Sequence, residues 1–187
     1  METTVNVNLN ADDWSEDRLV RACVRRERWA QRALYETYYG RLMGVCLRYA
    51  REESEAMDIL HEGFIKIFKN IRKFELGTSL TAWMRRIMVN TAIDFYRRNV
   101  RRRTDDLDDA YAVSSDAPDA VSRMTTQEIL AAVQQLTPAY RTVFNLYVVE
   151  GYSHKEIGER MGTTESTSRS NLVKARNRLK ELLTRES

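Results

Sequence analysis

Residues 153–183, SHKEIGERMGTTESTSRSNLVKARNRLKELL, carry the clearest fold signal in this chain. Ser153 and Glu156 stand at the spacing of a capping box, which opens a short helix. Gly162 follows at the point where that helix must turn, because glycine tolerates positive φ best. The two threonines that come next offer N-caps for a second, longer helix. The stretch therefore predicts a helix-turn-helix.

The second helix of this stretch has two opposite faces at about 100° per residue. The apolar face holds Leu172, Ala175, Leu179, Leu182 and Leu183. The polar face holds Ser166, Thr167, Ser170, Lys174 and Asn177. A helix of this kind can enter the major groove of DNA and read base edges with its first turns. Four cations would then hold phosphates: Arg169, Lys174, Arg176 and Arg178. The alternative is an ordinary helical hairpin with a solvated polar face.

The rest of the chain also favours helices. Only seven glycines and two prolines occur among 187 residues, whereas sheets need frequent turn residues. Helices are predicted after Ser15, over 34–49, from Ser54 to 71, over about 79–100, and on either side of Pro138. The expected fold class is all-α. It comprises an N-terminal helical bundle over 1–103, an acidic flexible linker over 104–123, and a C-terminal helix-turn-helix domain over 124–187.

Charge is unevenly distributed along the chain. The net charge is only +3, which says little about partners. The end of the predicted fourth helix is densely basic, with Arg97, Arg98, Arg101, Arg102 and Arg103. The linker that follows is acidic, with Asp105, Asp106, Asp108, Asp109, Asp116 and Asp119. We interpret it as an anionic spacer, either purely solvated or with a function of its own.

The fourth helix carries a polar row opposite its apolar stripe. The row contains Ser79, Arg86, Asn90, Asp94, Arg97 and Arg101. Trp83 falls with this polar group, and an aromatic ring among arginines can stack on unpaired bases. Asn90 could bond a base edge in two places while the arginines neutralise phosphate. The competing interpretation is that Trp83 caps the core of the bundle.

The third helix and the cysteines give no sign of catalysis. Between its apolar positions the third helix carries Asp58, His61, Glu62 and Lys66. His61 has no second His or Cys at the spacing of metal ligands, so a protein-docking face is favoured over a metal site or an acid–base site. Cys23 and Cys46 fit buried reduced thiols. We expect no metal, no cofactor and no enzymatic activity.

The N-terminus lacks the basic and apolar segments of a signal peptide. No apolar run approaches the roughly 20 residues that span a bilayer. We expect a soluble, cytoplasmic protein.

Three segments resemble sigma factors of the sigma-70 family, specifically the extracytoplasmic-function (ECF) group. DILHEGFIKIF, residues 58–68, resembles the segment that docks on the clamp helices of the largest polymerase subunit. TAWMRRIMVNTAID, residues 81–94, is similar to the family's segment that reads and melts the minus-10 element. Residues 136–183 resemble the domain that reads the minus-35 element. The resemblance implies sigma domain 2 over 1–103 and sigma domain 4 over 124–187.

The resemblance also implies roles for individual residues. Core-polymerase contacts would be Asp58, His61 and Glu62, with His61 standing where glutamine is more common. Minus-10 contacts would be Ser79, Trp83, Arg86, Asn90, Thr91, Asp94, Arg97, Arg98 and Arg101, with Asn90 at a flipped base. Minus-35 contacts would be Thr164, Ser166, Thr167, Arg169, Ser170, Lys174, Arg176 and Arg178.

Two positions depart from the family pattern. Ser168 replaces a usual buried valine, which predicts looser packing of the recognition helix. Asn171 replaces a common arginine, which removes one phosphate contact. The acidic linker resembles the family's connector through the polymerase cleft.

The expected function is transcription initiation. The chain would bind core RNA polymerase, read the minus-10 and minus-35 elements of promoter DNA and promote melting, with weak promoter binding when free. The resemblance further implies an anti-sigma partner, and we expect a monomer when free. Two alternatives remain open: a self-sufficient helix-turn-helix regulator, which needs a dimer and a palindromic operator, and a sigma-mimic that sequesters an anti-sigma factor.

Overall fold

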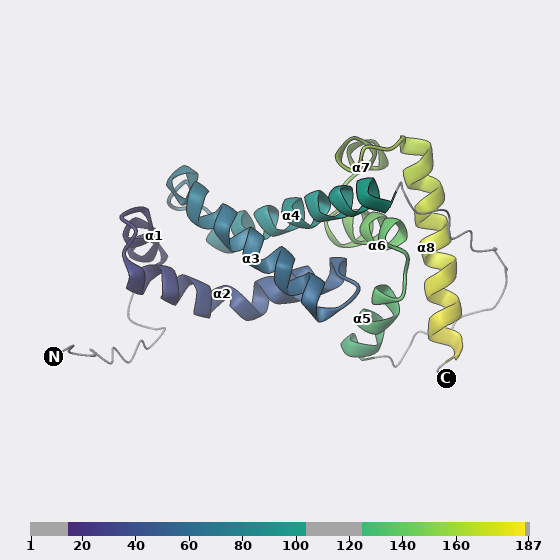
Figure 1. Cartoon of the computed structure of the whole chain (residues 1–187), viewed down its shortest axis with the longest axis horizontal. Helices are drawn as coiled ribbons and strands as arrows, with labels where there is room; N and C mark the ends of the chain where they lie inside the picture. The colour runs from purple at the N-terminus through teal and green to yellow at the C-terminus, as the bar shows by residue number, and fades with distance from the viewer. Residues whose placement is uncertain (1–14, 104–124, 186–187) are drawn as a thin grey trace.

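The computed structural model describes residues 15–103 and 125–185, and every regular element in these ranges is a helix (Figure 1). The predicted linker over 104–123 lies outside the described residues. The all-α fold class is confirmed.

The N-terminal bundle contains α1 (Glu16–Val24), α2 (Arg28–Tyr49), α3 (Glu53–Asn70), the short 3-10 helix η1 (Ile71–Lys73) and α4 (Leu80–Arg103). Ser15 caps α1 as predicted, since its Oγ accepts a hydrogen bond from the backbone N–H of Arg18 at 3.4 Å. Helix α3 begins at Glu53, one residue before the predicted start at Ser54, and α4 continues to Arg103 instead of ending near 100. Such end positions depend on caps that periodicity does not reveal.

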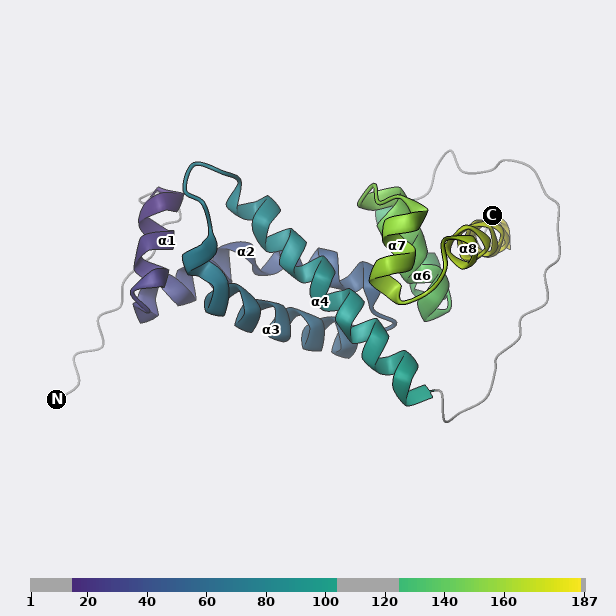
Figure 2. The same ribbon diagram turned by 90° about the horizontal axis from the view of Figure 1, so that it is seen from above.

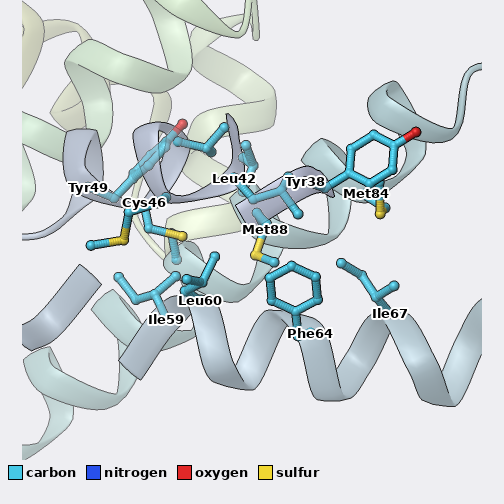
Figure 3. Packing of buried hydrophobic residues seen from close by; sticks show 14 of the residues in the cluster. Tyr38, Leu42, Cys46, Tyr49, Ile59, Leu60, Phe64, Ile67, Met84 and Met88 are labelled. Atoms are coloured by element: carbon cyan, nitrogen blue, oxygen red, sulfur yellow. The ribbon is translucent and has the colours of Figure 1, made fainter. Parts of the chain in front are cut away.

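The bundle core forms where α2, α3 and α4 pack together (Figure 3). Leu42, Leu60 and Met88, one from each helix, are all at most 1% exposed. Gly63 lets α3 approach α4 closely, because a Cβ at that position would lie 2.1 Å from Sδ of Met88. A larger residue would have to push the two helices apart or displace that methionine.

Both cysteines lie in this core as free thiols. Burial raises the pKa of Cys23 to about 11 and that of Cys46 to about 12. Both therefore stay protonated at neutral pH, and their burial is as predicted.

The C-terminal module contains α5 (Thr126–Gln134), α6 (Pro138–Phe144), the π-helix η2 (Asn145–Val149), α7 (His154–Met161) and α8 (Glu165–Arg185). Pro138 occupies the first turn of α6 as predicted, where its missing N–H costs nothing.

Arg141 organises the start of this module from a buried position. It is 2% exposed and donates to four backbone carbonyls, those of Tyr49, Val133, Gln134 and Leu136. Carbonyls at helix ends lack partners inside the helix, so one guanidinium satisfies the ends of both α5 and α2. Desolvation lowers the pKa of Arg141 to about 10, which still leaves it charged at neutral pH.

The two modules pack against each other, an arrangement that the sequence had left open. Helices α5 and α6 contact α2, and α6 and α7 contact α4 (Figures 1 and 2). Val143, Leu146 and Ile157 of the C-terminal module are fully buried in the same apolar cluster as the bundle core.

Across residues 15–103 and 125–185, every helix is too short or too polar to cross a membrane.

Candidate nucleic-acid interface

The predicted helix-turn-helix is present in α7 and α8. Ser153 and Glu156 form a complete capping box: Oε2 of Glu156 accepts from the backbone N–H of Ser153 at 2.9 Å, and Oγ of Ser153 accepts from that of Glu156 at 3.3 Å. Hydrogen bonds from the Ser153 hydroxyl, at 2.7 Å, and from its backbone N–H lower the pKa of Glu156. Gly162 ends α7 at φ 71, the left-handed conformation expected for it.

Thr164 caps α8, because its Oγ1 accepts from the backbone N–H of Thr167 at 3.0 Å. Leu172, Ala175 and Leu179 are buried beneath the helix. On its outer side most of the predicted minus-35 residues are exposed: Thr164, Ser166, Thr167, Arg169, Ser170, Lys174 and Arg176. Arg178, the remaining one, is half-buried. The two faces of α8 are therefore those predicted from its periodicity, except that Asn177, Leu182 and Leu183 are half-buried, while DNA contact by the exposed residues stays a prediction.

The predicted phosphate-binding cations differ in their surroundings. Arg169 pairs with Glu165 one turn earlier, and Arg178 lies 2.9 Å from Glu181. Arg176 instead extends over the ring of Tyr147, with its guanidinium carbon 5.9 Å from the ring centroid. Tyr147 thus limits where the Arg176 charge can point.

A buried polar pair, His154 with Ser168, fixes α8 against α7. Nδ1 of His154 lies 2.9 Å from Oγ of Ser168, and the imidazole stacks on Tyr147 with centroids 4.4 Å apart. Burial, and then the positive charge of Arg169, lower the pKa of His154. Ser168 is 0% exposed. A specific hydrogen bond therefore joins the two helices at Ser168, where serine in place of the family's usual valine had predicted looser packing.

The polar row of α4 is only partly available. Its exposed members are Ser79, Arg86, Asp94, Arg97 and Arg101, and Arg98, which lies beside the row, is exposed as well. Asp94, Arg97, Arg98 and Arg101 line a hollow of about 270 Å³, which suits a negatively charged group. Trp83 is half-buried and meets Phe74 edge-on at 5.6 Å, so it packs on the bundle core as the competing interpretation held.

Thr91 must be removed from the candidate minus-10 contacts. It is 0% exposed, and its hydroxyl donates to the carbonyl of Ile87 at 2.8 Å. The resemblance to the family implied a minus-10 contact at Thr91, whereas helical spacing puts Thr91 on the apolar stripe of α4, and its burial agrees with the spacing.

The predicted polymerase-binding residues lie on α3, with Asp58 and His61 exposed and Glu62 half-buried. Glu62 accepts two hydrogen bonds from Arg98 of α4, which lower the pKa of its carboxyl. Lys66 lies 3.0 Å from Glu62 and 2.9 Å from Asp94. This ion-pair network links the candidate core-binding and minus-10 surfaces, and sequence reasoning had treated the two as separate.

Comparison with known proteins matches both modules to family models. Residues 34–102 match the Sigma-70 region 2 model, and residues 126–179 match the Sigma-70 region 4 model. The first range covers most of α2 and extends through α3 to α4, and the second covers α5 to most of α8.

Individual relatives cover most of the chain. It is 30% identical over 153 residues to the RNA polymerase sigma factor CarQ of Myxococcus xanthus, covering 80% of this chain and 87% of that protein. It is 29% identical over 160 residues to the ECF sigma factor SigE of Mycolicibacterium smegmatis, but spans only 62% of its length. A solved structure, RpoE of Bartonella quintana in complex with the anti-sigma factor NepR, is 23% identical with a TM-score of 0.49, covering 82% of this chain and 96% of that one.

Proposed function

The chain belongs to the ECF group of the sigma-70 family, and on this premise we propose that it binds core RNA polymerase and directs it to promoters. The observation that carries the proposal is the geometry of α8. Its buried face holds it against the module, and its capped first turns present small polar and cationic side chains outward. A helix so presented fits the major groove.

The two modules would divide promoter recognition. Helix α8 reads the minus-35 duplex with Thr164, Ser166, Thr167 and Ser170, while Lys174 and the nearby arginines hold phosphates. Helix α4 reads and melts the minus-10 element, with Asn90 at a flipped base and Arg97, Arg98 and Arg101 on the backbone.

Core polymerase would dock on the α3 face that carries Asp58, His61 and Glu62. Docking fixes the spacing of two modules that are individually weak, so the second contact becomes intramolecular. For this reason we expect weak promoter binding by the free chain.

Further parts of the proposal rest on family membership. The chain itself catalyses no covalent reaction, because core polymerase makes the RNA. It acts in the cell interior, where the polymerase is, and an anti-sigma factor holds it inactive until a signal arrives.

Run-off transcription with core polymerase tests the proposal. The wild-type chain should support initiation from selected genomic fragments, and Asn90→Ala should abolish most of it. Asn99→Ala, the same substitution further along α4, is the matched control and should keep activity. Failure of the wild-type chain to initiate from any genomic fragment, or to join core polymerase at all, would refute the proposed function.

A further inference from the structure

Exposed arginines gather where α1 turns into α2. This group, the arginine corner, consists of Arg18, Arg21, Arg25, Arg26 and Arg28. At 100° per residue, Arg18, Arg21 and Arg25 share the side of α1 that faces away from its buried residues. The corner therefore presents its charge outward, and it belongs neither to the core-binding residues on α3 nor to the polar row of α4.

The acidic residues beside the corner offset only part of this charge. Glu16 accepts a hydrogen bond from the Tyr38 hydroxyl at 2.7 Å. Glu27 accepts from Arg25 at 2.6 Å and from the indole N–H of Trp29 at 2.5 Å, and these bonds lower the pKa of its carboxyl. Within residues 15–28, Asp17 is the one further acid. The corner therefore keeps a positive surplus, which attracts a polyanion.

Arg26 occupies a position where stability alone favours glycine. Its φ is 62, in the left-handed region that a Cβ disfavours. The backbone N–H of Arg26 bonds the carbonyl of Cys23 at 2.9 Å, and the next N–H bonds that of Ala22 at 3.1 Å. These two bonds form the Schellman ending of α1, in which glycine usually takes this position. An arginine here costs stability, which points to a use for its charge.

The basic surface continues from the corner to the start of α4. Helix α1 packs against η1, and η1 exposes Arg72 and Lys73. The chain then passes through Ser79, the first member of the polar row, into α4. Exposed cations thus extend the candidate minus-10 surface past the beginning of that helix.

The direction of α4 places the corner relative to the promoter. Helix α4 begins at the end of the bundle that carries α1 and runs towards Arg103, after which the chain continues to the C-terminal module (Figures 1 and 2). That module is the proposed reader of the minus-35 element, which lies upstream of the minus-10 element. The end of α4 therefore faces upstream, and its start, together with the corner, faces downstream.

We propose that the arginine corner, with Arg72 and Lys73, holds the backbone of the strand that carries the flipped base, just downstream of the minus-10 element. The proposal rests on the proposed function, because it extends the path of DNA along α4. Arginine binds phosphate through paired hydrogen bonds, and backbone contacts carry no sequence information. The corner therefore adds affinity and salt dependence but no sequence preference.

Binding of the holoenzyme to two promoter fragments tests the proposal. In the short fragment the strand with the flipped base ends at the minus-10 element, and in the long fragment it continues downstream. The readout is the difference between the two fragments in the slope of log affinity against log salt. Arg18→Gln with Arg21→Gln should reduce this difference by about 1.4, or about sevenfold in affinity between about 50 and 200 mM salt, because each phosphate contact on a single strand contributes about 0.7.

Arg51→Gln with Lys180→Gln is the matched control. Both side chains are exposed, both lie outside the corner, and the variant loses the same charge. It should keep the wild-type difference between the fragments.

Arg26→Gly separates DNA contact from folding. Glycine relieves the left-handed backbone, so Tm should rise by about 2–4 °C. The slope difference should nevertheless fall by about 0.7, because one phosphate contact is lost. Loss of contact in a more stable chain cannot be attributed to misfolding.

The proposal is overturned if Arg18→Gln with Arg21→Gln keeps the wild-type slope difference. It is also overturned if that variant instead weakens binding to core polymerase without DNA, since the partner of the corner would then be an acidic protein surface. Failure of the proposed function looks different, because the wild-type holoenzyme would then bind neither fragment.

Discussion

Replacing Ser168 with valine is expected to destabilise the C-terminal module, although valine is the more apolar residue. The Ser168 hydroxyl lies 2.9 Å from Nδ1 of His154, and the two residues are 0% and 8% exposed. Valine leaves that imidazole nitrogen buried without its partner, which costs about 1–3 kcal/mol. The added apolar contact stabilises the folded state by at most about 0.8 kcal/mol per methylene. The expected net loss is about 1–2 kcal/mol.

His154→Phe completes a double-mutant cycle. Phenylalanine can keep the stacking on Tyr147, and the Ser168 hydroxyl left behind can turn to the carbonyl of Thr164 one turn earlier. His154→Phe alone should therefore cost less than Ser168→Val alone. The double variant removes both polar partners and should recover most of the loss, giving a coupling energy of about 1–2 kcal/mol.

Thermal unfolding of the full chain, followed by far-ultraviolet circular dichroism, measures these differences. For a chain of this size each kcal/mol shifts Tm by about 2–4 °C, so Ser168→Val should melt about 3–6 °C below wild type. The reasoning is refuted if Ser168→Val melts with wild type, or if the loss in the double variant equals the sum of the single losses.

Three further predictions concern the same module. Burial, followed by the charge of Arg169, lowers the pKa of His154 in the folded state. The stabilisation present above about pH 6.5 should therefore be lost as the pH falls through the folded-state pKa. The Tm of His154→Phe should fall less on acidification than that of wild type, and an equal fall in both would contradict this. Arg141→Met leaves four backbone carbonyls without their donor, three of them in buried hydrogen bonds, and should lower the free energy of unfolding by about 3 kcal/mol or more. Urea denaturation checks this, and a wild-type midpoint would contradict it. Tyr147→Leu should release Arg176 and reduce the salt dependence of holoenzyme binding to minus-35 duplex by about one phosphate contact, a slope change of about 0.9. Tyr147→Phe keeps the ring and should bind as wild type; equal slopes for the two variants would count against the idea.

Signals between near neighbours in the chain made much of the fold predictable. The capping box at Ser153, the turn at Gly162 and the start of α6 at Pro138 each depend on contacts within a few residues, and all three are present. Helical periodicity also separated the buried and exposed sides of α8. At Thr91 periodicity indicated the buried side of α4, which the structure bears out, whereas the resemblance to the family had implied a DNA contact there.

Pairings between distant residues could not be predicted in this way. His154 with Ser168 joins positions 14 apart, and Glu62 with Arg98 joins positions 36 apart. A sequence pattern assigns each residue to a face of its own helix, but it does not specify which face of another helix will lie opposite. The sequence holds one signal that links His154 and Ser168. Each is a polar residue at a position that the helical pattern predicts to be buried.

The sequence by itself determined the helices, several of their caps, the two modules and the family to which they belong, because these features depend on short-range geometry and on motifs within one segment. Only the tertiary structure decided that Arg160 bonds Asn90 across 70 residues, and that Arg85 pairs with Glu150 across 65. Packing between modules depends on surfaces assembled from several helices at once. A face that the sequence presents as open to DNA can therefore be closed by the chain's own second module.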